Sequence, residues 1–302
     1  MSPTVRGSLL AALALALVGS LVAASDFVEG YPLSTGQALR YALAGGVLLV
    51  IARGRLPGLD RTEALGLVAL AATGLVLFNV FVIEGVRETD PATVGVIVGC
   101  VPVVLAIAGP LLEKRPISGR VFVAAVVVAA GAAGVQWAGG GITTAGLVLA
   151  LGALGCEAAF SLLAVPHLKR LGALAVSTYA CLFAVPMLAV WSLLVEGQSL
   201  PLPDAGQAAA LAYLGVGVTV LGFVSWYTAV GLLGVERAGL FSGVLPVSAL
   251  VFSAALGVAE LTPERLAAVA VVALGVTLGV RGEAPAAGET SARRLRTSPS
   301  GA

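Results

Sequence analysis

Long hydrophobic stretches alternate with short polar breaks along most of the chain. At a rise of about 1.5 Å per residue, each stretch is long enough to cross a hydrocarbon core of about 30 Å as a helix. Many stretches are rich in valine and glycine, which disfavour a helix in water. In lipid, however, a helix allows a single segment to form all the hydrogen bonds of its own backbone. The pattern predicts helices at residues 8–25, 35–52, 64–83, 93–112, 119–137, 145–165, 174–195, 207–230, 238–258 and 264–281.

Composition favours a membrane location for these helices. Hydrophobic residues make up 59% and charged residues 11% of the 302 residues, whereas soluble domains carry about 25% charged residues. The formal net charge of +1 provides no field to attract a nucleic acid. We expect no metal or other cofactor, because the three cysteines lie inside apolar stretches and the single histidine has no ligand partner at metal-site spacing.

Lysine and arginine are unevenly distributed over the polar breaks. The breaks on the N-terminal side of the predicted bundle hold Arg53, Arg55, Arg61, Lys114, Arg115, Arg120, Lys169, Arg170 and Arg237. Those on the other side hold Arg87 and Arg265 as their only basic residues. Because cytoplasmic loops are enriched in lysine and arginine, both termini are predicted to be cytoplasmic, which requires an even number of helices. Residues 282–302 are predicted to form a disordered basic cytoplasmic tail that can contact anionic lipid.

The two halves of the chain resemble each other. A shift of 144 residues aligns Gly95 with Gly239, Gly99 with Gly243, and Pro102 with Pro246. A shift of 139 residues aligns Gly7 with Gly146, so the first hydrophobic segment is the counterpart of the sixth. We therefore interpret residues 8–25 as a helix, although this segment also has features of a cleaved secretory leader.

Five helices per copy would make the second copy enter the membrane from the opposite side. We therefore predict an all-α membrane protein of ten helices in two inverted repeats, residues 1–140 and 141–281. Transporters of this plan bind their substrate between the halves and alternate access by rocking. Pro102 and Pro246 lie inside the fourth and ninth helices, where each removes a backbone hydrogen bond. They either only shape these helices or mark hinge or cavity-lining positions.

Several short motifs occur in a characteristic order. They are Gly7-Ser8-Leu9-Leu10-Ala11-Ala12, Ala38-Leu39-Arg40-Tyr41, Ala238-Gly239-Leu240-Phe241-Ser242, Leu245-Pro246-Val247 and Leu274-Gly275-Val276-Thr277-Leu278-Gly279. Their order and the repeat resemble the EamA-type branch of the drug/metabolite transporter superfamily, over residues 7 to 281. The resemblance implies ten helices, cytoplasmic termini and export of amino acids, metabolites or drugs.

Glu157 and Arg40 are the principal candidates for a role in transport. Glu157 lies deep in the sixth predicted helix, where an ionised carboxylate is costly. It could carry a coupling proton or bind a cationic substrate; the alternative is a protonated or arginine-paired structural carboxylate. Arg40 could pair with Glu157, Asp26 or Glu29, or bind a substrate carboxylate. The resemblance implies an arginine at this position whatever the substrate, which favours a structural role for it.

Four further polar or aromatic residues are weaker candidates for binding a substrate. Asn79 offers both donors and acceptors from the third helix. Ser161 could face a cavity, although serine also bonds the backbone of its own helix. Trp226 and Tyr227 could line the same cavity, but their position near the predicted cytoplasmic end of the eighth helix favours the interfacial aromatic belt.

The leading functional hypothesis is a secondary transporter rather than an enzyme. The sequence contains no phosphate-binding loop of the Gly-Lys-Ser/Thr kind. It also shows no arrangement of a nucleophile, a histidine and an acid that would form a catalytic triad. We expect export of small metabolites, amino acids or drugs across a bacterial plasma membrane, driven by an ion or substrate gradient. The alternative is a non-transporting scaffold or lipid-handling protein. A central cavity reached by Glu157 and Asn79 would favour transport, and a solid core would favour a scaffold.

Overall fold

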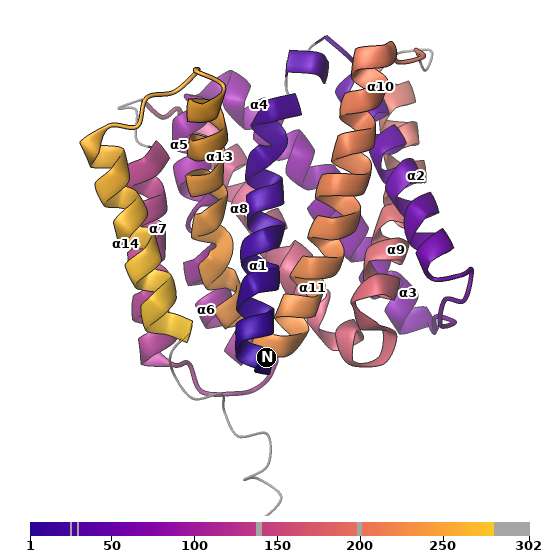
Figure 1. Ribbon diagram of the computed structural model, residues 1–302. Coiled ribbons are helices and arrows are strands. Elements are labelled where there is room, and N and C mark those ends of the chain that lie inside the picture. Colours follow the sequence, from indigo (N-terminus) through magenta and orange to yellow (C-terminus); the bar gives the residue numbers. More distant parts are fainter. Residues whose placement is uncertain (25, 29, 137–140, 198–200, 281–302) are drawn as a thin grey trace, which may run out of the picture.

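The computed structural model describes residues 1–24, 26–28, 30–136, 141–197 and 201–280. Throughout this part of the chain the regular elements are helices, arranged side by side in one bundle (Figure 1). The α-helices are α1 (Pro3–Gly19), α2 (Leu33–Ile51), α3 (Arg61–Leu70), α4 (Phe78–Glu88), α5 (Pro91–Val98), α6 (Val101–Leu112), α7 (Gly119–Gln136), α8 (Thr144–Leu162), α9 (Val165–Trp191), α10 (Ala205–Ala212), α11 (Gly222–Leu233), α12 (Val235–Gly239), α13 (Val244–Ala255) and α14 (Pro263–Val280). The 3-10 and π-helical stretches are η1 (Ser20–Ala24), η2 (Asp26–Val28), η3 (Ala71–Leu77), η4 (Ser192–Glu196), η5 (Tyr213–Leu221) and η6 (Leu240–Gly243). The predicted tail, residues 282–302, lies outside the described residues.

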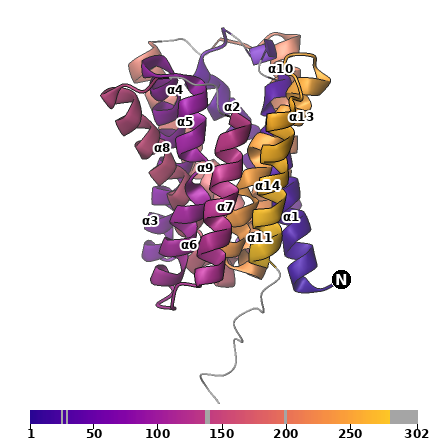
Figure 2. The ribbon, with the colours of Figure 1, turned by 90° about the vertical axis from the view of Figure 1, so that its left-hand side faces the viewer.

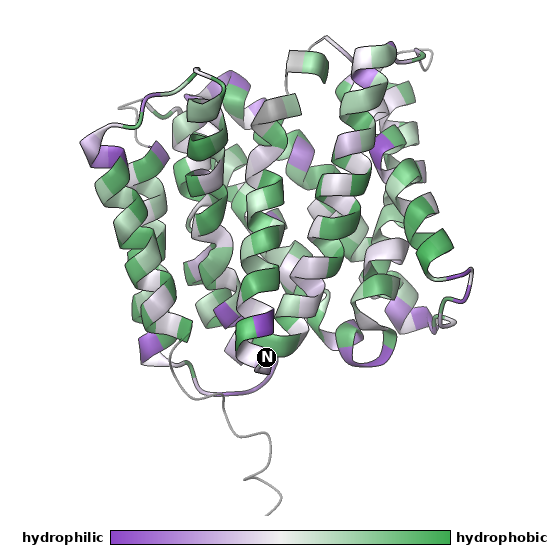
Figure 3. Ribbon diagram, viewed as in Figure 1, coloured by the Kyte–Doolittle hydropathy of each residue, from purple (hydrophilic) through white to green (hydrophobic). Residues whose placement is uncertain are grey.

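Within the described ranges, eight continuous helical stretches have the length and hydropathy needed to cross a membrane. They are Arg61–Glu88, Pro91–Leu112, Gly119–Gln136, Thr144–Leu162, Val165–Val195, Ala205–Leu233, Val235–Ala255 and Pro263–Val280. Hydrophobic residues cover most of their length, and hydrophilic residues gather toward the two ends of the bundle (Figure 3). The other two predicted segments are also helical: α1 is apolar but only 17 residues long, and α2 has 19 residues and includes Gln37 and Arg40.

The bundle has two end faces with different connections. We call the end formed by the N-terminus and residues 52–60, 113–118 and 163–172 the basic face; it is the lower end in Figure 1. The opposite face carries the connections at residues 89–90, 201–204 and 256–262. At the basic face, α9 begins earlier than the predicted residue 174, because a short arm precedes a bend at Gly172, where φ is 76°.

Two membrane-length helices are interrupted beside their prolines. α5 and α6 are separated by a break at Gly99 and Cys100, and Pro102 occupies the first turn of α6. The 3-10 stretch η6 likewise precedes α13, whose third residue is Pro246. A proline cannot donate to the carbonyl four residues earlier, so each interruption lies where that hydrogen bond is missing. Both prolines therefore lie next to an irregular stretch of their helix, and a role as hinges stays a prediction.

Two helices, α3 and α10, begin with the same capping motif and continue into a π-helix. A capping box of Asp60 and Glu63 starts α3, and a second one, of Asp204 and Gln207, starts α10, 144 residues later. Each carboxylate accepts a backbone N–H of the first turn while the other side chain reaches back to the cap. Both helices then continue into a π-helical stretch, η3 and η5 respectively.

Glycines allow close packing in contacts that the two halves exchange. α7 and α14 lie side by side (Figure 2), and a Cβ placed on Gly131 would lie 2.8 Å from a methyl carbon of Val272. A Cβ on Gly275 would lie 2.7 Å from a methyl carbon of Val128, which is the same contact with the halves exchanged. Glycine, which has no Cβ, permits two helices to approach this closely.

Helices α1 and α8 show a second exchanged contact. On α1, Gly7 faces Leu233 at the end of α11, and a Cβ placed on this glycine would lie 2.7 Å from the leucine side chain. On α8, Gly146 faces Thr89 at the end of α4, and a Cβ there would also lie at 2.7 Å. Leu233 and Thr89 are 144 residues apart, so the two contacts involve counterpart positions of the repeat.

Candidate functional site

A central cavity of roughly 470 Å³ lies among helices from both halves of the chain. Its walls come from α1, α2, η3 and α4, α5, α8, α11, and η6 with α13. Val86, Pro91 and Gln136, which lie near the opposite face, also line it. The cavity therefore extends toward the opposite face of the bundle.

Glu157 is the acidic residue that lines this cavity among the described residues. It lies in the second half of α8, toward the basic face, and its side chain is partly exposed. No hydrogen bond or ion pair engages its carboxylate in the described part of the chain, and the phenols of Tyr41 and Tyr227 lie within electrostatic range. A carboxylate without a counter-ion can bind a cation or take up a proton.

Arg40 lines the same cavity from α2 but is held by uncharged partners. Its Nε donates to Thr219 Oγ1 at 2.7 Å and one terminal nitrogen donates to Gln37 Oε1 at 3.4 Å. The guanidinium also lies 5.5 Å from the ring centroid of Tyr41. Arg40 does not form the ion pair with Glu157 that the sequence suggested. Its other two suggested partners, Asp26 and Glu29, have side chains that lie outside the described part of the structure. Arg40 is 8% exposed, and these contacts fix its orientation.

Two amides face the cavity in different ways. Asn79 on α4 donates its Nδ2 to the carbonyl of Leu75 at 2.7 Å, which leaves its Oδ1 as an acceptor. Gln136 at the end of α7 donates to the carbonyl of Gly95 at 3.1 Å. Sequence reasoning missed Gln136; its polar side chain at the end of an apolar helix was the available signal.

An aromatic cluster closes the cavity on the side of the basic face. Phe160 lies 5.0 Å from Phe223 and 5.2 Å from Tyr227, measured between ring centroids. Tyr41 joins the cluster 6.3 Å from Phe223. Tyr41, Phe160 and Phe223 line the cavity, whereas Tyr227 lies behind them and is 1% exposed. We call these four residues the aromatic floor.

Trp226 and Tyr227 do not belong to an interfacial belt, so that expectation is wrong. Both are buried inside the bundle. The indole N–H of Trp226 donates to Ser161 Oγ at 3.2 Å, and the Tyr227 hydroxyl donates to the carbonyl of Phe160 at 3.2 Å. Trp226 lines the cavity, whereas Ser161 lies behind it as a hydrogen-bond partner. Position along a helix predicts the depth of a residue but not its direction.

The two prolines differ in their relation to the cavity. Pro246 is part of its wall, together with Ser242 and Leu245. Pro102 is buried outside it, although its neighbour Val101 contributes to the lining. The two breaks therefore face the cavity asymmetrically.

A bundle of membrane-length helices around an internal cavity with a lone carboxylate defines a multi-pass membrane protein. The EamA-like transporter family model matches residues 5–137 and again residues 144–281. The chain belongs to this family, which is part of the drug/metabolite transporter superfamily. It is therefore a membrane transporter and not an enzyme.

Two curated relatives and one solved structure agree with this family and fold. The chain is 29% identical to the uncharacterized transporter YetK of Bacillus subtilis (strain 168) over 255 residues, covering 80% of this chain and 77% of YetK. It is 25% identical to the uncharacterized transporter YyaM of the same organism over 254 residues, covering 80% of this chain and 83% of YyaM. A protein crystal structure matches with a TM-score of 0.75 and 18% identity, covering 90% of this chain and 96% of that one, which shows the fold alone.

Proposed function

We propose that this protein is a secondary transporter that exports small metabolites, amino acids or drugs across the bacterial plasma membrane by alternating access. The observation that carries the proposal is the central cavity, with an unpaired Glu157 on one wall. A scaffold would be expected to have a solid core instead of such a cavity between its halves. Glu157 is proposed to carry the coupling proton or to bind a cationic group of the substrate.

The architecture proposed for this cycle is ten spanning helices in two inverted five-helix repeats, residues 1–140 and 141–281. The capping boxes spaced 144 residues apart and the exchanged glycine contacts of Gly131 and Gly275 support it. In this scheme α1 and α2 also cross the membrane and, with the eight longer helices, make up the ten. Two such halves can rock about the cavity so that it opens first to one side and then to the other.

The basic face is proposed to lie in the cytoplasm, with both termini on that side. Cytoplasmic loops are enriched in lysine and arginine, and Arg53, Lys114 and Lys169 lie in or beside the connections of this face. The opposite face then lies outside the cell, and the cavity extends toward it. In this assignment the described conformation is the one that releases an exported substrate.

Two ion pairs join the halves at the basic face, and we refer to them as the two latches. Arg115, between α6 and α7, lies 2.9 Å from Glu236 of α12. Arg170 of α9 pairs with Glu63 of α3. In the described part of the chain, no ion pair joins the halves at the opposite face; Arg87 and Glu84 pair within α4. The latches thus favour closure of the basic face.

In one of the latches, the buried carboxylate of Glu236 is paired with the guanidinium of Arg115. Glu236 is 5% exposed, and its Oε2 has no hydrogen-bond partner among the described residues. Burial lowers the pKa of Arg115, but its hydrogen bonds to Glu113 and Glu236 outweigh this and raise the pKa above its ordinary value. The guanidinium therefore stays charged, and opening the basic face must separate it from Glu236.

A cavity-filling substitution tests the proposal. Full-length protein in lipid vesicles would be preloaded with pools of labelled amino acids, amines and drug-like cations. We expect flux of at least one pool above empty vesicles, reduced at least tenfold by Val98→Trp, which fills the cavity wall of α5. Val123→Trp on α7 is the matched control, because Val123 is 58% exposed on the outer surface. Equal flux in both variants, or no flux of any pool, would contradict the proposal.

A further inference from the structure

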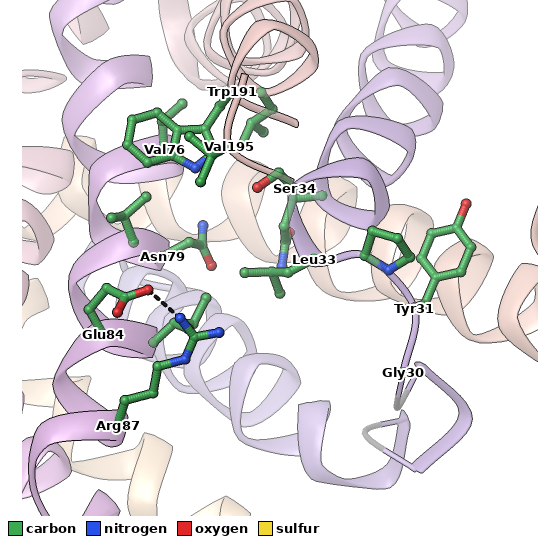
Figure 4. Close-up of a pocket in the computed structure, with 15 residues that line it drawn as sticks. Gly30, Tyr31, Leu33, Ser34, Val76, Asn79, Glu84, Arg87, Trp191 and Val195 are labelled. Carbon is green, nitrogen blue, oxygen red and sulfur yellow. Dashed lines mark hydrogen bonds and ion pairs between the residues drawn. The ribbon is translucent and has the colours of Figure 1, made fainter. Parts of the chain in front are cut away.

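A second cavity, of roughly 600 Å³, lies near the opposite face between the start of α2, the length of α4 and the end of α9 (Figure 4). We call it the side pocket. Among the residues that line the two cavities, Asn79 is the one that lines both. The side pocket therefore adjoins the central cavity at this side chain. Its volume lies within the range of about 300–1,000 Å³ typical of small-molecule sites.

Two side chains of the side pocket, Asn79 and Gln37, offer one acceptor and one donor without a charge. Asn79 uses its Nδ2 to bond the carbonyl of Leu75, so its Oδ1 is available as an acceptor. Gln37 accepts from Arg40 through Oε1, so its amide nitrogen is available as a donor. Both side chains are partly exposed to the pocket. A hydroxyl or amide group can bond to both at once.

The outer end of the side pocket carries two charges that cancel each other. Arg87 lies 2.7 Å from Glu84, as the dashed line in Figure 4 marks, and their side chains are 69% and 46% exposed. An ion of either sign would have to displace one of these partners. The rim therefore does not select for a charged ligand.

Another part of the side-pocket wall is apolar. Val76 and Val80 face it from η3 and α4, and Leu188 and Trp191 face it from α9. Figure 4 shows the Trp191 ring and Asn79 on the wall of one space. Apolar surface removed from water by a ligand here would favour binding in proportion to its area. Along η3 and α4 the polar Asn79 lies between the apolar Val76 and the pair of Glu84 and Arg87, so the pocket has an uncharged polar group beside its apolar wall (Figure 4).

We propose that the side pocket is a second ligand site, for a small amphipathic molecule with an uncharged polar head. The head bonds to Asn79 and Gln37, and the apolar body lies against Trp191. A cationic head at Gln37 would lie beside the Arg40 guanidinium, which donates to Gln37, and would have no counter-ion there, which is unfavourable. The proposal concerns binding, so it stands or falls independently of the transport assay described above.

Photolabelling of the purified full-length protein tests this site. The probe is octanol carrying a diazirine, which has a donating and accepting head and an apolar body. We expect adducts on the segments that contain Val80 and Trp191, reduced at least fivefold by excess unlabelled octanol. Val80→Trp, which fills the pocket, should remove these adducts. Val190→Trp, on the outward surface of the same helix as Trp191 and 54% exposed, should leave them unchanged.

A second pair of substitutions keeps the test decisive if Val80→Trp does not fold. Asn79→Leu combined with Gln37→Leu removes both polar partners at similar volume. We expect about tenfold more octanol to be needed to compete for the adducts, the equivalent of losing one to two hydrogen bonds. A diazirine-labelled octane, which lacks the head, should bind both forms equally. Adducts that octanol does not displace, or that are unchanged by both variants, would overturn the proposal.

Discussion

At the scale of single residues, Glu157 and Arg40 illustrate how far the sequence can be interpreted. An acidic residue inside an apolar helix is conspicuous, and the structure places Glu157 on the cavity wall. Arg40 is equally conspicuous, but its partner Thr219 lies 179 residues away and is an ordinary threonine in the sequence. A polar residue in a membrane helix can therefore be identified locally, whereas its hydrogen-bond partner depends on tertiary packing.

For the aromatic residues Trp226 and Tyr227, the sequence did not predict the direction in which the side chains point. The sequence indicates how deep Trp226 and Tyr227 lie along their helix, but not which side of the helix carries them. Both side chains point into the bundle, where Tyr227 packs with Phe160 and Phe223 in the aromatic floor. The spacing of Phe223 and Tyr227, one helical turn apart, was the available signal for this inward face.

The hydrogen bond between Trp226 and Ser161 gives a prediction at this scale. Trp226→Phe removes the donor while keeping an aromatic ring, so we expect the free energy of unfolding to fall by about 1 kcal/mol. Trp226→Ala also leaves a void and should cost about 3–5 kcal/mol. Denaturant titration in detergent measures both.

A double-mutant cycle provides the control. If the hydrogen bond exists, the loss from Ser161→Ala and the loss from Trp226→Phe will not add in the double variant. Additive losses would show that the two side chains do not interact.

At the scale of elements, the positions of the helices were largely predictable and their irregularities only partly so. Long apolar stretches locate the helices to within a few residues, because crossing the hydrocarbon core requires that length. The breaks before α6 and α13 lie next to Pro102 and Pro246, although the sequence predicted continuous helices there. Nothing in the local sequence indicated the π-helical stretches η3 and η5, which depend on how each helix packs against its neighbours.

The packing of α7 against α14 gives a prediction at the element scale. Valine at Gly131 would meet Val272, and valine at Gly275 would meet Val128, at separations too short for ordinary contact. We expect Gly131→Val and Gly275→Val to lower the free energy of unfolding by similar amounts, about 1–3 kcal/mol each. Gly46→Val on α2 is the control, because a Cβ there has no neighbour within 4 Å. Markedly unequal losses would contradict the exchanged contact.

At the scale of the whole molecule, the two latches predict which substitutions open the basic face. The double variant Glu236→Gln and Glu63→Gln weakens both pairs, so the population open to that face should rise. A cysteine introduced at Ala238, which is 0% exposed, would report this opening after the three native cysteines are replaced by alanine. We expect several-fold faster labelling by a membrane-impermeant maleimide applied to the basic face.

Glu84→Gln is the matched control for the latches. It weakens the ion pair with Arg87 within α4 near the opposite face, so it should leave the labelling rate unchanged. An equal rate increase with Glu84→Gln, or no increase in the latch variant, would show that the latches do not hold the basic face closed.

Substrate-dependent proton flux in vesicles tests the central claim most directly. Wild-type protein and its Glu157→Gln and Glu84→Gln variants would be reconstituted, and internal pH followed after a pH jump while pools of amino acids, amines and drug-like cations are added. The account predicts proton flux that requires one of these pools, persists in Glu84→Gln and disappears in Glu157→Gln. Substrate-coupled flux that is unchanged in Glu157→Gln would contradict it and place the coupling elsewhere in the cavity.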